Sequence, residues 1–146
     1  MRGLIRSLLI VAEALLLAAC AGGSDLSEQF AAAKAAARPA SDKAAEQAVV
    51  AYFATAEKIP ATAGYGFNPV ANGVSGFSGP GWFMCGNVSF PEADGRYGRV
   101  LPFIVHFDPK NPERVAEGAI ERGDFELVTG WCRSVYGMNY LPLSGG

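Results

Sequence analysis

The fold is decided by residues 82–107, WFMCGNVSFPEADGRYGRVLPFIVHF. Two runs of this stretch, 82–90 and 99–107, are rich in aromatic and β-branched residues, and the segment between them contains Asp94-Gly95. Two such runs around an Asp-Gly turn predict a β-hairpin.

Both faces of the second predicted strand are largely apolar. Successive side chains of a strand point to opposite faces. One face therefore carries Leu101, Phe103, Val105 and Phe107, and the other carries Val100, Pro102, Ile104 and His106. Because Pro102 has no N–H to donate to a neighbouring strand, it indicates a bulge or an edge position.

An amphipathic helix is predicted before the hairpin, over about residues 42–58. Ser41 and Asp42 offer N-cap oxygens. An apolar face follows at helical spacing, formed by Ala45, Val49, Tyr52, Phe53 and Ala56. The helix has to end before Pro60, because proline disfavours helical geometry in the residue ahead of it. Residues 61–81 are rich in glycine and predict a loop, or a loop with one short strand.

The chain after the hairpin has two interpretations. In the first, a helix runs over 112–122 and a strand follows it. In the second, 114–121 is a third strand, and a helix runs over 125–136 after a capping Asp124. The second is favoured because apolar side chains recur at helical spacing. These are Phe125, Val128, Trp131, Cys132, Val135 and Tyr136.

Together these elements predict one α+β domain over residues 41–146. A helix packs on a small antiparallel sheet of about three strands, and a C-terminal element, favoured as a helix, completes it. Half of the 146 residues are hydrophobic and 18% are charged, which suits a single compact core. Residues 20–40 are Ala-rich, and we expect a partly helical tether there; a first helix docked on the domain is the alternative.

Residues 1–19 have the order of a secretory signal, with Arg2 and Arg6 ahead of an apolar run that ends in small residues. The run is too short to cross a bilayer, which needs about twenty apolar residues. Residues 17–20, LAAC, resemble the lipobox of bacterial lipoproteins. This resemblance implies cleavage before Cys20, a lipid on that cysteine, and attachment to the outer membrane facing the periplasm. The alternative is ordinary cleavage and a soluble secreted protein.

A disulfide is predicted between the two remaining cysteines. With Cys20 taken by lipid, Cys85 and Cys132 are an even pair in an exported, oxidising compartment, where such pairs are normally joined. Closing a loop of about 48 residues stabilises a fold by roughly 4 kcal/mol on the chain-entropy model. A redox-active pair is disfavoured because the chain has no C-x-x-C motif.

Several residues of the hairpin form a pattern: Cys85-Gly86, Val88, Gly95, Tyr97 and Pro102-Phe103. The pattern resembles one found in small proteobacterial lipoproteins and exported proteins, which carry C-G-x-V, a turn with Gly and Tyr, a P-F pair and a late cysteine. The resemblance implies a signal peptide, a helix, a hairpin and a location in the cell envelope. It implies no particular activity.

Catalytic signals are weak. His106 lies in a predicted strand, and Asp108 follows two residues later, so the two could act as a base and its orienting group. No nucleophile motif accompanies them, so a lone histidine at a strand edge is favoured. One histidine and three cysteines are too few for a closed zinc site without carboxylates, and we expect no metal and no cofactor.

The tip of the hairpin is a predicted binding surface. Arg96, Tyr97 and Arg99 are residue types that anchor protein interfaces, although a solvated turn is the simpler interpretation. The net charge of −2, from 12 basic and 14 acidic side chains, argues against nucleic acid as a partner.

The expected function is a non-catalytic accessory or protein-interaction role in the cell envelope, so an enzyme is not expected. An envelope protein is the expected partner, besides the membrane reached through the lipid. Two alternatives are a binding inhibitor of a periplasmic hydrolase, which would present 61–81 or the hairpin tip, and a small hydrolytic enzyme that uses His106 and Asp108.

Overall fold

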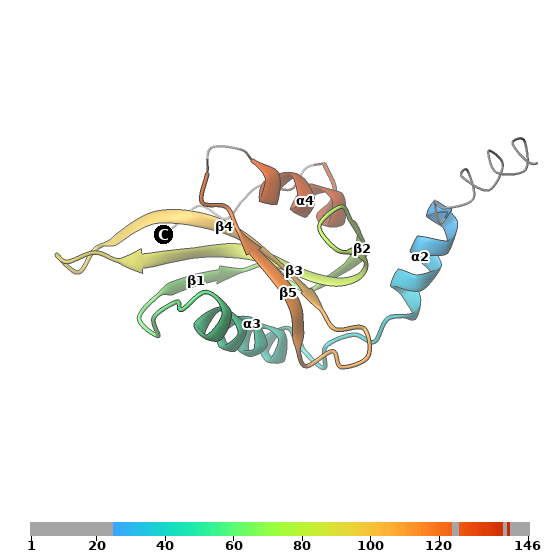
Figure 1. Cartoon of the computed structure of the whole chain (residues 1–146), viewed down its shortest axis with the longest axis horizontal. Helices are drawn as coiled ribbons and strands as arrows, with labels where there is room; N and C mark the ends of the chain where they lie inside the picture. Colours follow the sequence, from blue (N-terminus) through green and yellow to red (C-terminus); the bar gives the residue numbers. More distant parts are fainter. Residues whose placement is uncertain (1–24, 124–125, 139, 141–146) are drawn as a thin grey trace, which may run out of the picture.

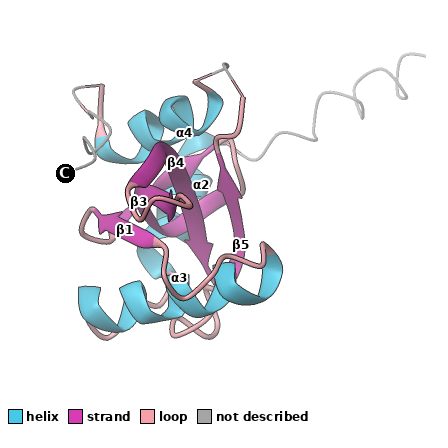
Figure 2. Ribbon diagram, turned by 90° about the vertical axis from the view of Figure 1, so that its left-hand side faces the viewer, coloured by secondary structure: helices cyan, strands magenta, loops and turns pink. Residues whose placement is uncertain are grey.

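The computed structural model describes residues 25–123, 126–138 and 140. An antiparallel sheet of five strands forms its middle layer, with helices on both faces (Figures 1 and 2). The strands are β1 (Gly64–Phe67), β2 (Ala71–Ser75), β3 (Gly79–Pro91), β4 (Tyr97–Phe107) and β5 (Val115–Ile120). The helices are α2 (Leu26–Ala35), α3 (Asp42–Ala56) and α4 (Leu127–Tyr136). The chain is therefore of the α+β class, as expected.

The predicted hairpin is confirmed as β3 and β4, which are longer than the runs 82–90 and 99–107 from which it was predicted. Cys85 pairs with Ile104 and Val88 with Leu101, so the strands are in antiparallel register along most of their length. Pro102 lies one residue beyond the β4–β5 ladder, which begins at Phe103. β4 nevertheless lies between β3 and β5, and the Pro102 carbonyl accepts a hydrogen bond from the Glu121 N–H at 2.8 Å. Pro102 also pairs with Asn87 of β3 without a register shift, so the expected bulge or edge position is wrong.

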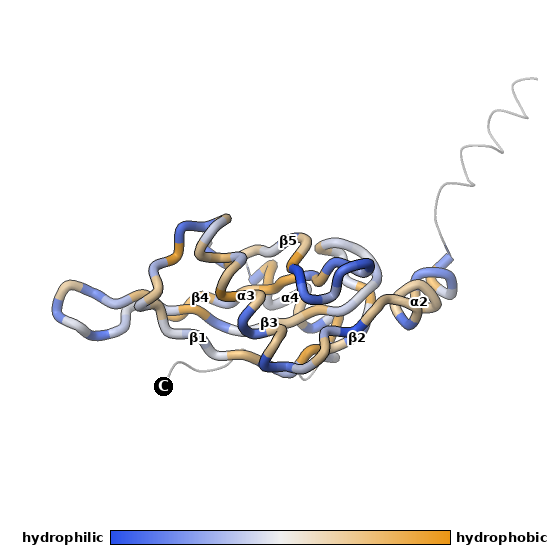
Figure 3. The backbone as a smooth tube through the Cα atoms, turned by 90° about the horizontal axis from the view of Figure 1, so that it is seen from below, coloured by the Kyte–Doolittle hydropathy of each residue, from blue (hydrophilic) through white to orange (hydrophobic). Residues whose placement is uncertain are grey.

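The two faces of β4 enter two separate cores. Phe103 and Val105 pack under α3, together with Met84 and Val88 of β3. Ile104 packs under α4 with Phe83, Cys85, Val128 and Cys132. In Figure 3 the hydrophobic stretches of β3, β4 and β5 meet in the middle of the molecule, as a sheet covered on both faces requires.

α3 confirms the predicted helix before the hairpin. The Ser41 hydroxyl accepts a hydrogen bond from the Ala44 N–H at 3.1 Å and caps the helix. Ala45, Val49 and Phe53 are the buried residues of α3 and lie one turn apart from each other. The helix ends at Ala56, two residues before the expected end.

The prediction of a loop over residues 61–81, and of about three strands, was wrong. This segment forms β1 and β2, both of which pair with β3 on the side opposite β4. The glycines of this segment led to the prediction of a loop, because glycine is common in turns. In a strand, glycine also allows two backbones to approach closely. A methyl group on Gly86 of β3 would collide with the Gly66 carbonyl of β1.

The second interpretation of the C-terminal part is confirmed: β5 is a strand, and α4 follows it. The helix over 112–122 is therefore wrong. α4 begins at Leu127, and its Val128 N–H donates to the Glu121 carboxylate at 2.6 Å, so the residue after β5 caps the helix. The capping role expected of Asp124 falls outside the described residues. Cys132 of α4 forms the predicted disulfide with Cys85 of β3.

α2 lies against β2 and β3, as the docked-helix alternative expects. Ala33 is buried, and its carbonyl accepts a hydrogen bond from the Asn72 side chain. Over residues 26–35 a docked helix therefore takes the place of the expected tether. The lipid predicted on Cys20 lies outside the described residues and stays a prediction. None of the described helices is both long enough and apolar enough to cross a bilayer.

Candidate functional site

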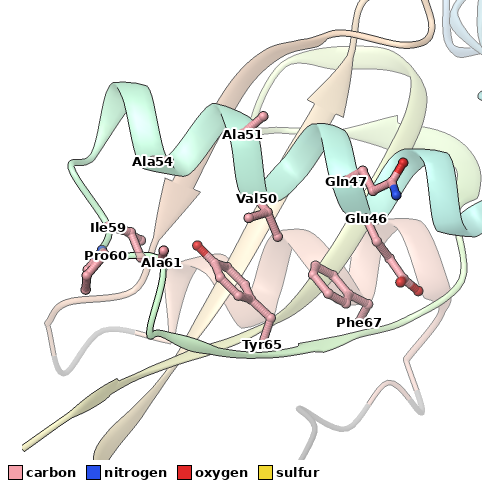
Figure 4. A pocket seen from close by; sticks show the side chains of 10 residues that line it. All are labelled: Glu46, Gln47, Val50, Ala51, Ala54, Ile59, Pro60, Ala61, Tyr65 and Phe67. Atoms are coloured by element: carbon pink, nitrogen blue, oxygen red, sulfur yellow. The ribbon is translucent and has the colours of Figure 1, made fainter.

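An open apolar groove of about 430 Å³ lies between α3 and β1. α3 turns its large buried residues toward the sheet, which leaves Val50, Ala51 and Ala54 along the groove. Opposite α3, β1 and the connection that leads into it form the floor of the groove (Figure 4). The groove is lined by Glu46, Gln47, Val50, Ala51, Ala54, Ile59, Pro60, Ala61, Tyr65 and Phe67.

Two aromatic rings of β1 make the floor of this groove. Tyr65 and Phe67 are two residues apart on the strand, so their side chains share one face. Their rings are parallel within 3°, with centroids 5.6 Å apart. Both rings meet the buried ring of Phe103 edge-on, at 6.3 and 6.0 Å. Because the core holds the rings in place, the floor is formed before any ligand arrives.

The few polar groups of the groove sit at its ends. Figure 4 shows Glu46 and Gln47 beside Phe67, while the Tyr65 hydroxyl points toward the Ile59 end. Burial raises the pKa of the Tyr65 phenol, and its neutral hydroxyl can donate a hydrogen bond. No histidine, cysteine, lysine or arginine occurs among the described residues that line the groove. Its chemistry is that of a binding site with an apolar middle and a carboxylate at one end.

His106 is buried in the sheet rather than exposed at a catalytic surface. It is 6% exposed, and its ring stacks on Phe83 with the centroids 4.7 Å apart. The Nδ1 atom lies 3.8 Å from the Glu117 carboxylate of β5, and the Pro80 backbone is a further polar neighbour of the ring. Burial lowers the pKa of the imidazole, and the Glu117 carboxylate opposes this shift.

Asp108 does not serve His106 as an orienting group. Its carboxylate accepts a hydrogen bond from the Arg114 guanidinium at 2.6 Å and from the Lys110 N–H at 2.9 Å. It therefore stabilises the turn between β4 and β5. The strand register instead places Glu117 opposite His106. The geometry of a histidine with its orienting carboxylate is thus absent at the predicted pair.

The hairpin tip brings the three predicted binding residues to one end of the molecule, where β3 and β4 project beyond the other strands (Figure 1). The Arg96 guanidinium pairs with the Asp94 carboxylate at 2.7 Å. Tyr97 is 57% exposed, and its hydroxyl donates to the Thr62 carbonyl at 3.4 Å. Arg99 is exposed on β4. Only Tyr97 offers a large apolar surface there.

Sequence reasoning missed the groove. The alternation of Tyr65 and Phe67 around a glycine was the available signal, since period-two aromatics indicate one face of a strand. A second signal was Val50, an apolar residue that lies outside the predicted buried face of the helix over 42–58. Neither signal tells which helix and strand face each other.

Among the described residues, no three histidine, cysteine, aspartate or glutamate side chains gather in a way that could hold a metal ion. Compared with protein-family models, curated proteins and solved structures, the chain has no match.

Proposed function

We propose that this chain is a lipid-anchored protein of the cell envelope that acts by binding another protein, without catalysis. The order of residues 1–19, the LAAC sequence at 17–20 and the disulfide between Cys85 and Cys132 support export. A disulfide that joins β3 to α4 inside the core is useful only where thiols are oxidised.

The apolar groove between α3 and β1 is the observation that carries the binding role. A preformed aromatic floor with few polar groups suits an extended segment of a partner that inserts an apolar side chain over Tyr65 and Phe67. The Glu46 carboxylate at the Phe67 end favours a basic residue next to that side chain. The partner is therefore an envelope protein with a basic, apolar segment.

Mass spectrometry of the mature protein from membranes tests export and anchoring together. We expect a chain that begins at Cys20 with added acyl groups, and two fewer hydrogens than the reduced chain because of the disulfide. A Cys20→Ser variant should leave the membrane fraction. An unmodified chain that still contains residues 1–19 would refute the proposal.

Photo-crosslinking in cells tests the groove. A photoreactive amino acid at Val50 should give one discrete adduct with an envelope protein, and Tyr65→Ala in the same chain should reduce its yield. The matched control position is Leu127 on α4, which is also exposed and apolar, at 54% against 38% for Val50. Adducts of equal yield at Val50 and Leu127 would contradict a role for the groove.

Inhibition of a periplasmic hydrolase is a second candidate, favoured by the projecting tip of the β3–β4 hairpin. All residues from Pro91 to Tyr97 are exposed, so the tip can enter a cleft on a target. Purified protein should then inhibit an envelope glycosidase or protease, and Tyr97→Ala should abolish this effect. The hydrolytic alternative has less support, because Asp108 is engaged by Arg114 and His106 is buried.

A further inference from the structure

α2 is held at a fixed angle on the domain by its C-terminal end. Ala33 is 1% exposed against the sheet, and the Asn72 amide donates to its carbonyl. The Trp82 indole N–H donates to the Ala36 carbonyl at 3.0 Å, and the Arg38 guanidinium lies 5.3 Å from the centre of the same indole. The direction of α2 is therefore set by packing rather than by a loose connection.

The N-terminal half of α2 projects past the sheet (Figures 1 and 3). Two large apolar side chains of this half are exposed. Leu26 is 65% exposed and Phe30 is 53% exposed. They are four residues apart, so they lie on the same side of the helix, one turn from each other. Asp25 accepts a hydrogen bond from the Ser27 N–H and caps the helix, which keeps this first turn formed.

The distance to the lipid-bearing cysteine is short. Leu26 follows Cys20 by six residues, and a fully extended chain of six residues spans about 20 Å at most. With a lipid on Cys20, α2 begins within that distance of the acyl chains. The chain between the anchor and the helix therefore cannot take Leu26 and Phe30 far from the bilayer surface.

We propose that Leu26 and Phe30 insert into the surface of the membrane that holds the lipid, and that α2 thereby sets the orientation of the whole domain. The inference rests on the proposed lipidation of Cys20. Two side chains bind a bilayer weakly by themselves, so the acyl chains supply attachment and the pair supplies direction. Because Asp25 and Glu28 lie on the same half of the helix, the contact is apolar rather than a cationic attraction to anionic lipid.

Tryptophan quenching by brominated lipid tests this contact on the lipidated, full-length mature protein. Phe30→Trp is compared with Leu127→Trp, whose native side chain is equally exposed, at 54%, on α4. Both are measured against the native chain, which carries Trp82 and Trp131. The vesicles are phosphatidylcholine with bromine close to the glycerol end of the acyl chains, because an interfacial helix places its apolar side chains about 5–10 Å deep.

The expected result is a loss of emission and a blue shift for the residue 30 variant only. Higher salt should leave both unchanged, since no ion attraction is involved. In a sample whose mass shows the lipid, equal quenching at residues 30 and 127, or no quenching at residue 30, would refute the insertion alone. A mass without lipid on Cys20 overturns the proposed anchoring, and the insertion falls with it.

Discussion

The hydroxyl of Tyr136 accepts a hydrogen bond from the peptide N–H of Cys85 at 3.2 Å. The same hydroxyl donates to the carbonyl of Pro69 at 2.6 Å. At this point the edge of β3 has no strand beside it, because pairing with β1 stops at Gly86 and pairing with β2 starts at Phe83. A tyrosine side chain from α4 thus satisfies the backbone where the sheet ladder is interrupted.

Tyr136→Phe should lower the free energy of unfolding by about 1–3 kcal/mol, because it leaves the Cys85 N–H and the Pro69 carbonyl without their partner. Urea unfolding followed by circular dichroism measures this change. Tyr97→Phe is the matched control: its hydroxyl is exposed and makes only a 3.4 Å contact, so its midpoint should stay at the native value. Equal losses for the two variants would contradict the role of Tyr136.

Removing the disulfide with Cys85→Ala and Cys132→Ala together should cost about 4 kcal/mol, since the unfolded chain regains the freedom of a long loop. The urea midpoint of the double variant measures the cost. Reducing agent added to the native protein should produce a similar decrease and should not affect the double variant. A native midpoint that is insensitive to reductant would show that the pair adds nothing to stability.

Gly86→Ala should destabilise the protein by about 3 kcal/mol, because overpacking forces strands apart. The new methyl group would meet the Gly66 carbonyl and the Phe103 ring. Gly130→Ala in α4 is the opposite case, since no described atom outside its own stretch of helix lies within 4 Å of the added carbon. A helical Gly→Ala exchange should stabilise the protein by about 0.5–1 kcal/mol. Thermal unfolding of both variants should therefore shift in opposite directions.

His106 should make the protein less stable as the pH falls below about 6.5, the usual pKa of histidine in an unfolded chain. Burial lowers the pKa of His106 in the folded state, so between the two pKa values the unfolded chain binds more protons, and stability increases with pH. The effect is complete at neutral pH and is lost as the pH drops toward the folded pKa.

Urea midpoints measured at about pH 7.5 and pH 5.5 test this dependence. The carboxylates with shifted pKa, those of Asp25, Asp94 and Asp108, have lowered values and titrate below this range. His106→Gln should therefore remove most of the difference between the two midpoints. If the variant keeps the full pH dependence, His106 is not its source.

Local patterns predicted a large part of the fold correctly. Residues 99–107, which are apolar on both faces, predicted the second strand of the hairpin. Ser41 marked the start of α3 because its hydroxyl can cap a helix. Helical spacing around Cys132 selected the correct one of two interpretations for the C-terminal part. These signals work because each depends on residues that are neighbours in the sequence.

The candidate site was not predicted, because its two sides come from α3 and β1. The helical pattern of α3 and the alternation in β1 do not indicate that these two elements lie side by side. His106 shows the same limit. Its sequence neighbour Asp108 suggested a catalytic pair, whereas the register between β4 and β5 placed Glu117 opposite the imidazole. The carboxylate that faces a histidine is determined by strand pairing. The sequence of a single strand does not indicate its pairing.

The sequence by itself determined the hairpin, α3, the pairing of Cys85 with Cys132 and the expectation of export. The tertiary structure decided that the glycine-rich residues 64–75 form two strands, that α2 docks through Ala33 and that a groove opens over Tyr65 and Phe67. The physical reason is that hydrophobic periodicity acts within a segment. Ladder hydrogen bonds to β3, close contacts at glycine and the shape of a groove arise only when distant segments meet.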